Sequence, residues 1–347
     1  MPQHLQNPWR GKGFLPEAIH PIDHADDVAA LLAQCPAHQP TPLTQSPELA
    51  KLAGVANVWI KDERSRMGLG SFKALGAAHA IAREAAATEP DDWSTALNGQ
   101  VFVTASAGNH GLSVAAGARV FGAKAVIYLS KTVPAAFADR LKSFGADVVI
   151  EGDDYEASMT AAAKAAEDKG WTLLSDSSWE GYFELPLRVM EGYVQMADEA
   201  AQDIPEPPTH ILLQAGVGGL AGAVAAHARK TWGAAPRIIV VEPDAAPALY
   251  ESIRQGKLVD TTGPVSSMGR LDCKTASVIA LAGLSRDADQ FTLISEGEAK
   301  DAMPTLAEHG FETTPSGGAG LAALLAGLNL PPDARVLTFL SEGPENV

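Results

Sequence analysis

The chain has 347 residues, of which 46% are apolar, so it is long enough to bury a large core in one or two domains. Its 42 acidic residues outnumber 26 Lys and Arg, and the net charge of -16 argues against a nucleic-acid or anionic-membrane surface. Only two cysteines, Cys35 and Cys273, are present, which excludes a disulfide framework or a four-thiolate metal site and fits a reducing cytoplasm.

The first hundred residues show the least regular pattern. Residues 1–30 contain four prolines and no continuous apolar run, which predicts neither a secretory signal nor a membrane helix. Residues 75–87 are expected to form a helix that buries its Ala, Leu and Ile side chains. Ser71 is a plausible N-cap for this helix, and this would place Lys73 in the first turn. The helix dipole and partial burial would then lower the pKa of the Lys73 amine, as a Schiff-base lysine requires. A solvated surface lysine is the alternative.

From residue 100 onward, short β-branched runs alternate with Ala-rich segments, which predicts a parallel sheet covered by helices. The expected strands cover 101–104, 125–129, 147–150, 172–174, 211–213, 237–241 and 335–340. The expected helices cover 112–121, 135–144, 155–169, 186–201 and 220–230. A polar stretch at 88–100 and a Pro-rich link at 204–209 suggest boundaries between lobes.

Polar or glycine-rich residues directly follow several predicted strands. These are residues 105–111, Ser175-Asp176, residues 214–219, Glu242 and Ser341-Glu342-Gly343. Ligands of open α/β sheets bind at the carboxyl ends of the strands, so we expect the functional site at this edge.

The glycine loop Gly216-Val217-Gly218-Gly219 lies between a strand and the helix that begins near Leu220. Its backbone N–H groups can surround a phosphate at a helix N-terminus. Gly216, Gly218 and Ala221 also satisfy the dinucleotide pattern GxGxxG/A, and Glu242 could hold a ribose. A phosphate cradle, a dinucleotide site and a plain tight turn therefore all stay open.

The loop Ser106–Gly111 leads into a helix, so its amides and a serine hydroxyl could bind a carboxylate, and Asn109 could donate from its side chain. An ordinary capped loop is the alternative. Asp176 is a candidate base or, alternatively, a helix cap. No histidine spacing predicts a catalytic metal. Four basic residues are expected to be solvated or structural, unless one of them binds an acidic substrate group: Arg64, Arg66, Arg270 and Lys274.

Together these motifs resemble the fold-type II pyridoxal-phosphate enzymes, which include threonine dehydratase and tryptophan synthase β. The resemblance rests on Lys61-Asp62-Glu63 with Gly70-Ser71-Phe72-Lys73, on residues 104–111, on Gly216–Gly219 and on Ser341, and it spans roughly residues 40 to 345. It implies an α/β fold with two lobes, each an open, mostly parallel sheet flanked by helices. Residues 1–85 and 186–347 would form the large cofactor-binding domain, and residues 86–185 a small domain carrying the substrate-carboxylate loop.

The resemblance also assigns roles to the motif residues. Lys73 would hold pyridoxal 5'-phosphate as a Schiff base, and Ser341 would face the ring nitrogen. The cofactor-binding residues would be Phe72, Lys73, Asn109, Gly216, Val217, Gly218, Gly219, Leu220 and Ser341. The substrate carboxylate would rest on Ser106, Ala107, Gly108, Asn109 and His110.

Within this group the chain most resembles diaminopropionate ammonia-lyase, through residues 176–182, 190–193 and 271–273. The likeness implies a homodimer that eliminates ammonia from a small L-amino acid, with Asp176 and Lys73 as the catalytic residues. Ala107 stands where that lyase has an aspartate associated with the D-isomer, so turnover of D-substrates is not expected.

The leaving β-group is left open by the sequence. A serine, threonine or hydroxyaspartate dehydratase on the same fold is the first alternative. An NAD-dependent dehydrogenase built on the glycine loop and Glu242, or a catalytically silent scaffold, is more distant.

Overall fold

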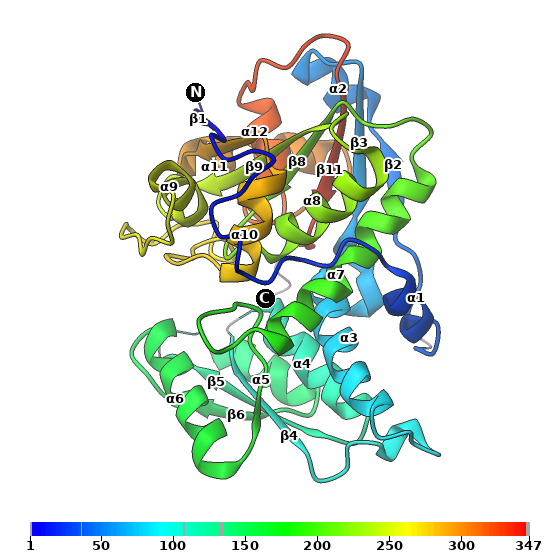
Figure 1. Ribbon diagram of the computed structural model, residues 1–347, viewed down its shortest axis with the longest axis vertical. Helices are drawn as coiled ribbons and strands as arrows, with labels where there is room; N and C mark the ends of the chain where they lie inside the picture. The colour runs from blue at the N-terminus through cyan, green and yellow to red at the C-terminus, as the bar shows by residue number, and fades with distance from the viewer. Residues whose placement is uncertain (1, 36, 107, 132, 134, 345–347) are drawn as a thin grey trace.

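The computed structural model describes residues 2–35, 37–106, 108–131, 133 and 135–344. Two lobes lie one above the other in Figure 1, and each contains its own β-sheet. Within the described residues, no helix combines the length and apolar character needed to cross a membrane.

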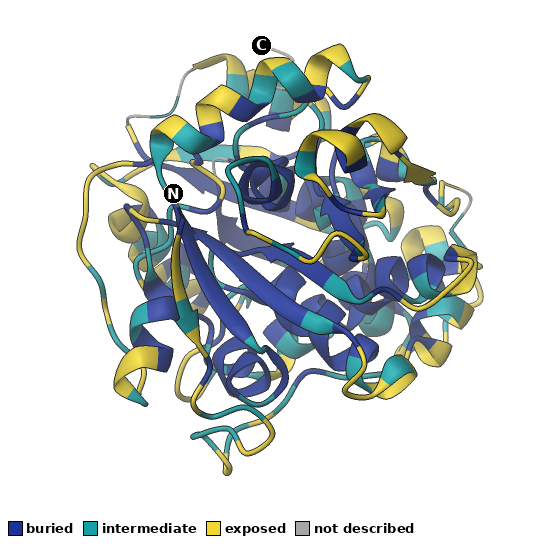
Figure 2. Ribbon diagram, turned by 90° about the horizontal axis from the view of Figure 1, so that it is seen from above, coloured by how far each residue is buried: buried dark blue, intermediate teal, exposed yellow. Residues whose placement is uncertain are grey.

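The larger sheet has seven strands in the order β1-β10-β9-β8-β11-β3-β2. The five inner strands run parallel, and β1 and β2 pair antiparallel at the two edges. The bounds are β1 Gln3–Gln6, β2 Leu43–Gln45, β3 Asn57–Asp62, β8 His210–Gln214, β9 Arg237–Pro243, β10 Gln290–Ile294 and β11 Arg335–Leu340. Figure 2 shows the inner strands buried, as expected for a parallel sheet with helices on both faces.

Separate groups of helices cover the two faces of this sheet. One apolar cluster joins it to α7 Glu184–Asp203, α8 Gly219–Trp232, α9 Ala248–Gln255 and α10 Val278–Asp287. A second cluster joins it to α2 Pro47–Ala53, α11 Glu296–Glu308 and α12 Ala319–Leu325. The strands of this sheet therefore lie between two layers of helices.

The smaller sheet has four parallel strands in the order β6-β5-β4-β7. They are β4 Val101–Ala105, β5 Lys124–Leu129, β6 Asp147–Ile150 and β7 Thr172–Leu173. Its helices are α4 Asn109–Val120, α5 Ala135–Ser143 and α6 Tyr155–Lys169. The remaining elements are α1 Asp26–Leu32, η1 Glu63–Gly68, α3 Lys73–Ala86 and η2 Trp93–Thr95.

Helices α3 and α7 cross at very close range where the lobes meet (Figure 1). A Cβ atom on Gly192 of α7 would lie 2.5 Å from the carbonyl oxygen of Leu75 on α3. A Cβ atom on Gly76 of α3 would lie 2.5 Å from the ring of Tyr193 on α7. The contact extends one apolar core from the larger sheet into the smaller one.

The expected α/β architecture is confirmed, and the segments 147–150, 155–169 and 335–340 match their elements residue for residue. Strands β1, β2, β3 and β10 were not predicted. The N-cap role of Ser71 is wrong: the backbone of Ser71 pairs with Glu342, and Phe72 occupies the N-cap position without a side-chain cap. The lobe boundaries at residues 85 and 185 stay predictions.

Candidate active site

Lys73 and Asp176 form a short ion pair at the junction of the two lobes. Lys73 is the first residue of α3, and Asp176 follows β7 of the smaller sheet. The two side chains are only 20% and 17% exposed. Their contact places an amine and a carboxylate where a proton can pass directly between them.

The charges of this pair shift both pKa values. Burial alone would lower the pKa of Lys73, but the Asp176 carboxylate raises it above its ordinary value. Burial alone would raise the pKa of Asp176, and the Lys73 ammonium lowers it well below the usual range. The expected lowering of the Lys73 pKa is therefore wrong in this state, because an opposite charge in contact outweighs burial and the helix dipole.

The glycine loop presents uncapped amides at the start of α8. Gly218 has φ +98 at the N-cap, and no side chain among the described residues caps this helix. A Cβ atom on Gly216 would lie 2.9 Å from Cys273 Sγ, and one on Gly219 would lie 3.3 Å from the Tyr193 ring. Free N–H groups at a helix N-terminus fit a phosphate-bearing cofactor.

A second observation fits the same kind of ligand. The hydroxyl of Ser71 is buried beside the lysine loop and has no hydrogen-bond partner within the described part of the chain. A buried hydroxyl without a partner is costly, so the surroundings of Lys73 suit a ligand that brings its own polar atoms.

The loop before α4 is closed by its own serine. The Ser106 hydroxyl accepts hydrogen bonds from the amides of Gly108 at 3.2 Å and Gly111 at 3.1 Å, which leaves its hydrogen available for donation. His110 Nε2 lies 2.8 Å from the Leu174 carbonyl oxygen, and burial lowers the pKa of His110. Its ring is thus held by the backbone just after β7, and its Nδ1 is buried without a partner in the described part of the chain. Ala107 lies outside the described residues.

Glu342, next to Ser341, connects the two lobes. Its buried carboxylate accepts short hydrogen bonds from Asn109 Nδ2 in the smaller lobe and from the Thr314 hydroxyl in the larger lobe. Arg270 Nε lies 3.6 Å from the same carboxylate. The Asn109 amide therefore turns its nitrogen toward Glu342, whose carboxyl oxygen accepts the hydrogen bond.

Ser341 itself holds the lysine loop through its backbone, because its carbonyl oxygen accepts from Phe72 N at 3.0 Å. Beside Asn109 and Glu342 lies a cavity of about 480 Å³, and the described residues that line it include neither Lys73 nor Asp176. Its wall includes residues of both lobes: Arg64, Gly70, Asn109, Arg140, Arg270, Glu312 and Glu342.

The four basic residues considered from the sequence are all in contact with other groups of the chain. Lys274 Nζ donates to two carbonyl oxygens and to Asp272. Arg66 is fully buried against Glu63 and Glu199. Arg64 pairs with Asp62 at the rim of the cavity. Arg270 pairs with Glu342 and extends across Gly108, whose Cβ position lies 3.3 Å from its side chain.

Glu242 does not have the role that a dinucleotide site would need. Its two carboxylate oxygens accept from the amides of Leu249 and Tyr250, each at 2.7 Å, and its side chain is fully buried. Burial raises the pKa of Glu242 to about 8. The ribose-binding interpretation of Glu242 is wrong, because the backbone amides at the start of α9 already donate hydrogen bonds to both oxygens of this carboxyl group.

Three residues near Lys73 were not selected from the sequence as site residues: Tyr193, Cys273 and Glu342. Burial raises the pKa of Cys273 to about 12, so its thiol stays neutral beside the glycine loop. Glu342 had one available signal, because it is an acidic residue directly after a predicted strand. Tyr193 had none beyond its place in a motif.

Comparisons with known proteins identify the family of the chain. The sequence model of a family described as pyridoxal-phosphate dependent enzyme matches residues 35–342. Diaminopropionate ammonia-lyase of Escherichia coli (strain K12) is 33% identical over 343 residues, which cover 89% of this chain and 86% of that protein. The L-serine dehydratase/L-threonine deaminase of Homo sapiens is 32% identical over 292 residues, covering 83% of each chain.

A solved structure is similar over nearly the whole length. It is the crystal structure of diaminopropionate ammonia lyase from Escherichia coli in complex with an aminoacrylate-PLP azomethine reaction intermediate. The TM-score is 0.86 at 30% identity, and the match covers 99% of this chain and 94% of that chain.

Proposed function

The chain belongs to the family of pyridoxal-phosphate dependent enzymes, and from this premise we propose an ammonia-lyase that acts on a small L-amino acid resembling 2,3-diaminopropionate. The supporting observation is the Lys73–Asp176 pair, which lies near the uncapped glycine loop at the meeting point of the two lobes. The bound cofactor supplies an electron sink, which makes the substrate α-proton acidic and lets the β-substituent leave.

The residues of the chain divide the remaining work. Lys73 would hold the cofactor aldehyde through its amine, and when this amine is free it would move protons beside Asp176. Asp176 or Lys73 takes the α-proton, and their direct contact allows that proton to be returned to the departing amine. Ser106 and the amides of the loop before α4 receive the substrate carboxylate.

The net reaction with diaminopropionate consumes one water and yields pyruvate with two ammonia molecules. Serine would yield pyruvate and one ammonia molecule with no net water, because the water lost in the elimination is taken up again in the hydrolysis. The human relative, whose name includes L-serine dehydratase, favours this dehydratase as a second candidate. The ratio of ammonia to pyruvate, measured over a panel of L- and D-amino acids, separates the two. With alanine at position 107, we expect L-isomers to be preferred.

Lys73→Ala tests the proposal. The variant should lose the yellow, borohydride-reducible attachment of the cofactor, and elimination should fall at least about 100-fold because attachment and proton transfer are both removed. Mass spectrometry of the reduced protein should place the added mass on the wild-type peptide that contains Lys73.

Lys51→Ala, at an exposed position on α2, is the matched control and should keep both colour and activity. Full activity in Lys73→Ala would contradict the proposal. A homodimer working in the cytoplasm stays a prediction that rests on the resemblance and the cysteine count.

A further inference from the structure

Tyr193 is a fully buried tyrosine beside the candidate active site, and nothing described so far uses its hydroxyl. It lies on α7, its exposed fraction is 0%, and its hydroxyl makes no hydrogen bond of good geometry among the residues that the structure describes, although Lys73 lies close enough to oppose the rise of its pKa. Buried hydroxyl groups in folded proteins nearly always form a hydrogen bond, so we expect the Tyr193 hydroxyl to bind a ligand that supplies the partner. We infer that the Tyr193 hydroxyl binds the phosphate group of the cofactor. The inference rests on the proposed function, because it requires that cofactor.

The ring of Tyr193 is wedged between the two elements that would hold the cofactor. Its Cε2 lies 3.3 Å from the Cβ position of Gly219, in the first turn of α8. Its Cζ lies 2.8 Å from the Cβ position of Gly76, in the first turns of α3. The Phe72 ring centroid is 4.8 Å away, and Lys73 Nζ lies 5.6 Å from the centroid of the Tyr193 ring.

Two glycines therefore make room for this ring. An alanine at position 76 or 219 would press against it, and the backbones of α3 and α8 could not approach it as closely. The hydroxyl stands one bond beyond Cζ, at the corner between the lysine loop and the glycine loop. A phosphate seated on the glycine loop would lie near that corner.

As a hydrogen-bond donor, the Tyr193 hydroxyl is better matched by an anion than by the Lys73 ammonium. Burial raises the pKa of Tyr193, so the hydroxyl keeps its hydrogen and acts as a donor. The Lys73 ammonium already donates to Asp176, and it could use the tyrosine oxygen only as an acceptor. The hydroxyl hydrogen would then still lack a partner. A phosphate oxygen accepts this hydrogen, beside the N–H groups of the loop.

Tyr193→Phe tests the inference with two aldehydes, pyridoxal 5'-phosphate and pyridoxal, which lacks the phosphate. The affinity of the variant for pyridoxal phosphate should fall about tenfold, as expected for a lost hydrogen bond to a charged group. Its affinity for pyridoxal should stay within about twofold of the wild type. Equilibrium dialysis of cofactor-free protein measures both constants without any turnover.

The melting temperature of the cofactor-free protein gives a second measurement. Tyr193→Phe should melt no lower than the wild type, because it removes a buried hydroxyl that has no partner there. Tyr250→Phe is the matched control: the Tyr250 hydroxyl accepts from Gln3 Nε2 at 3.1 Å. That control should melt lower and bind both aldehydes normally.

Two results would overturn the inference. One is an unchanged affinity of Tyr193→Phe for pyridoxal phosphate. The other is an equal loss for both aldehydes, which would place the hydroxyl at Lys73 instead of at the phosphate. If wild-type protein bound neither aldehyde, the proposed function itself would be contradicted, and the inference would fall with it.

Discussion

At the scale of single residues, the Lys73–Asp176 contact determines the charge state of the site. Each group alone would be driven toward its neutral form by burial, and together they remain charged. A carboxylate held below its usual pKa stays ionised through neutral pH, so it can accept a proton whenever the cofactor makes one available. The same ion pair makes Asp176 a weaker base, so its basicity should rise once the Lys73 amine is bound to the cofactor and no longer carries the ammonium charge.

Replacing Asp176 by asparagine removes that base and keeps its size. We expect kcat/KM for the L-substrate to fall about 100-fold or more, while the cofactor stays attached to Lys73. The pKa of the free Lys73 amine should also fall, because burial is then no longer opposed by the carboxylate. A pH–rate profile, with the absorbance of the bound cofactor followed in parallel, measures these effects.

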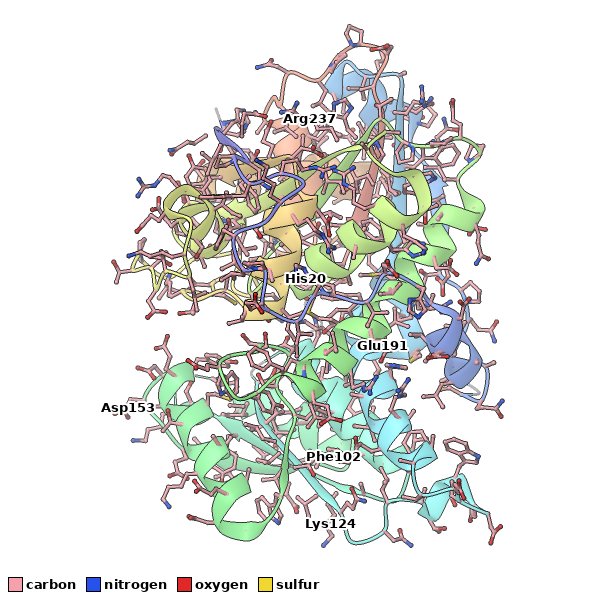
Figure 3. All side chains as sticks on the ribbon, in the orientation of Figure 1. His20, Phe102, Lys124, Asp153, Glu191 and Arg237 are labelled. Carbon is pink, nitrogen blue, oxygen red and sulfur yellow. The ribbon has the colours of Figure 1, made fainter. Side chains whose placement is uncertain are left out.

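Asp153→Asn is the control for this change. Asp153, labelled in Figure 3, forms an exposed pair with Lys131 at the surface of the smaller lobe. Its replacement should leave the rate and the profile unchanged. An unaltered pH profile in Asp176→Asn would remove Asp176 from the mechanism.

The sequence allowed the site residues to be placed but did not reveal their partners. Lys73, Asp176 and the glycine loop could be selected because each occupies a recognisable position at a strand end or a helix start. The Asn109–Glu342 bond joins residues 233 positions apart, and no local pattern records it. The pKa of Lys73 was misjudged for the same reason, since its partner lies 103 residues away.

At the scale of helices and strands, the crossing of α3 and α7 depends on glycine. Gly192→Ala would place a methyl group 2.5 Å from the Leu75 carbonyl oxygen, which is backbone and cannot turn aside. We expect the free energy of unfolding to fall by about 1–3 kcal/mol, as for other overpacked cores. Urea unfolding followed by circular dichroism measures the change.

Gly297→Ala makes the same substitution in α11, where the nearest atom to the new Cβ is Ser295 Oγ at 3.9 Å. Here the variant should be as stable as the wild type or up to about 1 kcal/mol more stable, because alanine favours the helix. If both variants lost the same stability, close packing at the crossing would not be the cause.

The missed strands also have a physical explanation at this scale. Strand β3 carries Lys61, whose ammonium is fully buried and pairs with Glu199 at 2.7 Å, so its sequence lacks the apolar run of an inner strand. The edge strand β1 has the sequence QHLQ and is largely exposed. Apolar periodicity identifies inner strands, and it fails where an inner strand buries an ion pair or an edge strand faces solvent.

At the scale of the whole molecule, α7 runs past the place where the lobes meet and carries two buried carboxylates in ion pairs. Glu199 pairs with Arg66 and Lys61 beneath the larger sheet. Glu191, labelled in Figure 3 where the lobes meet, pairs with His79 of α3 at 2.9 Å. Burial alone would raise the pKa of each glutamate, but these partners lower both from 4.5 to about 2.

The direction of the resulting pH dependence follows from those shifts. Because each folded-state pKa lies below its unfolded value, the contribution to stability is complete above pH 4.5 and is lost as the pH falls toward 2. Each group then removes up to about 1.4 kcal/mol per pH unit. One continuous core spans both lobes, so the loss at α7 should affect the two lobes together.

We therefore expect acid unfolding in a single step. Hydrogen exchange measured between pH 5 and 2 should show strands β4 and β5 losing protection at the same pH as β8 and β11. Glu199→Gln should be less stable than the wild type at pH 7, and the difference should shrink as the pH falls through the window, because protonation makes the two side chains alike in charge. Glu308→Gln, at an exposed position on α11, should follow the wild type throughout. If the smaller lobe opened more than half a pH unit before the larger one, α7 would not be the link that holds the molecule together.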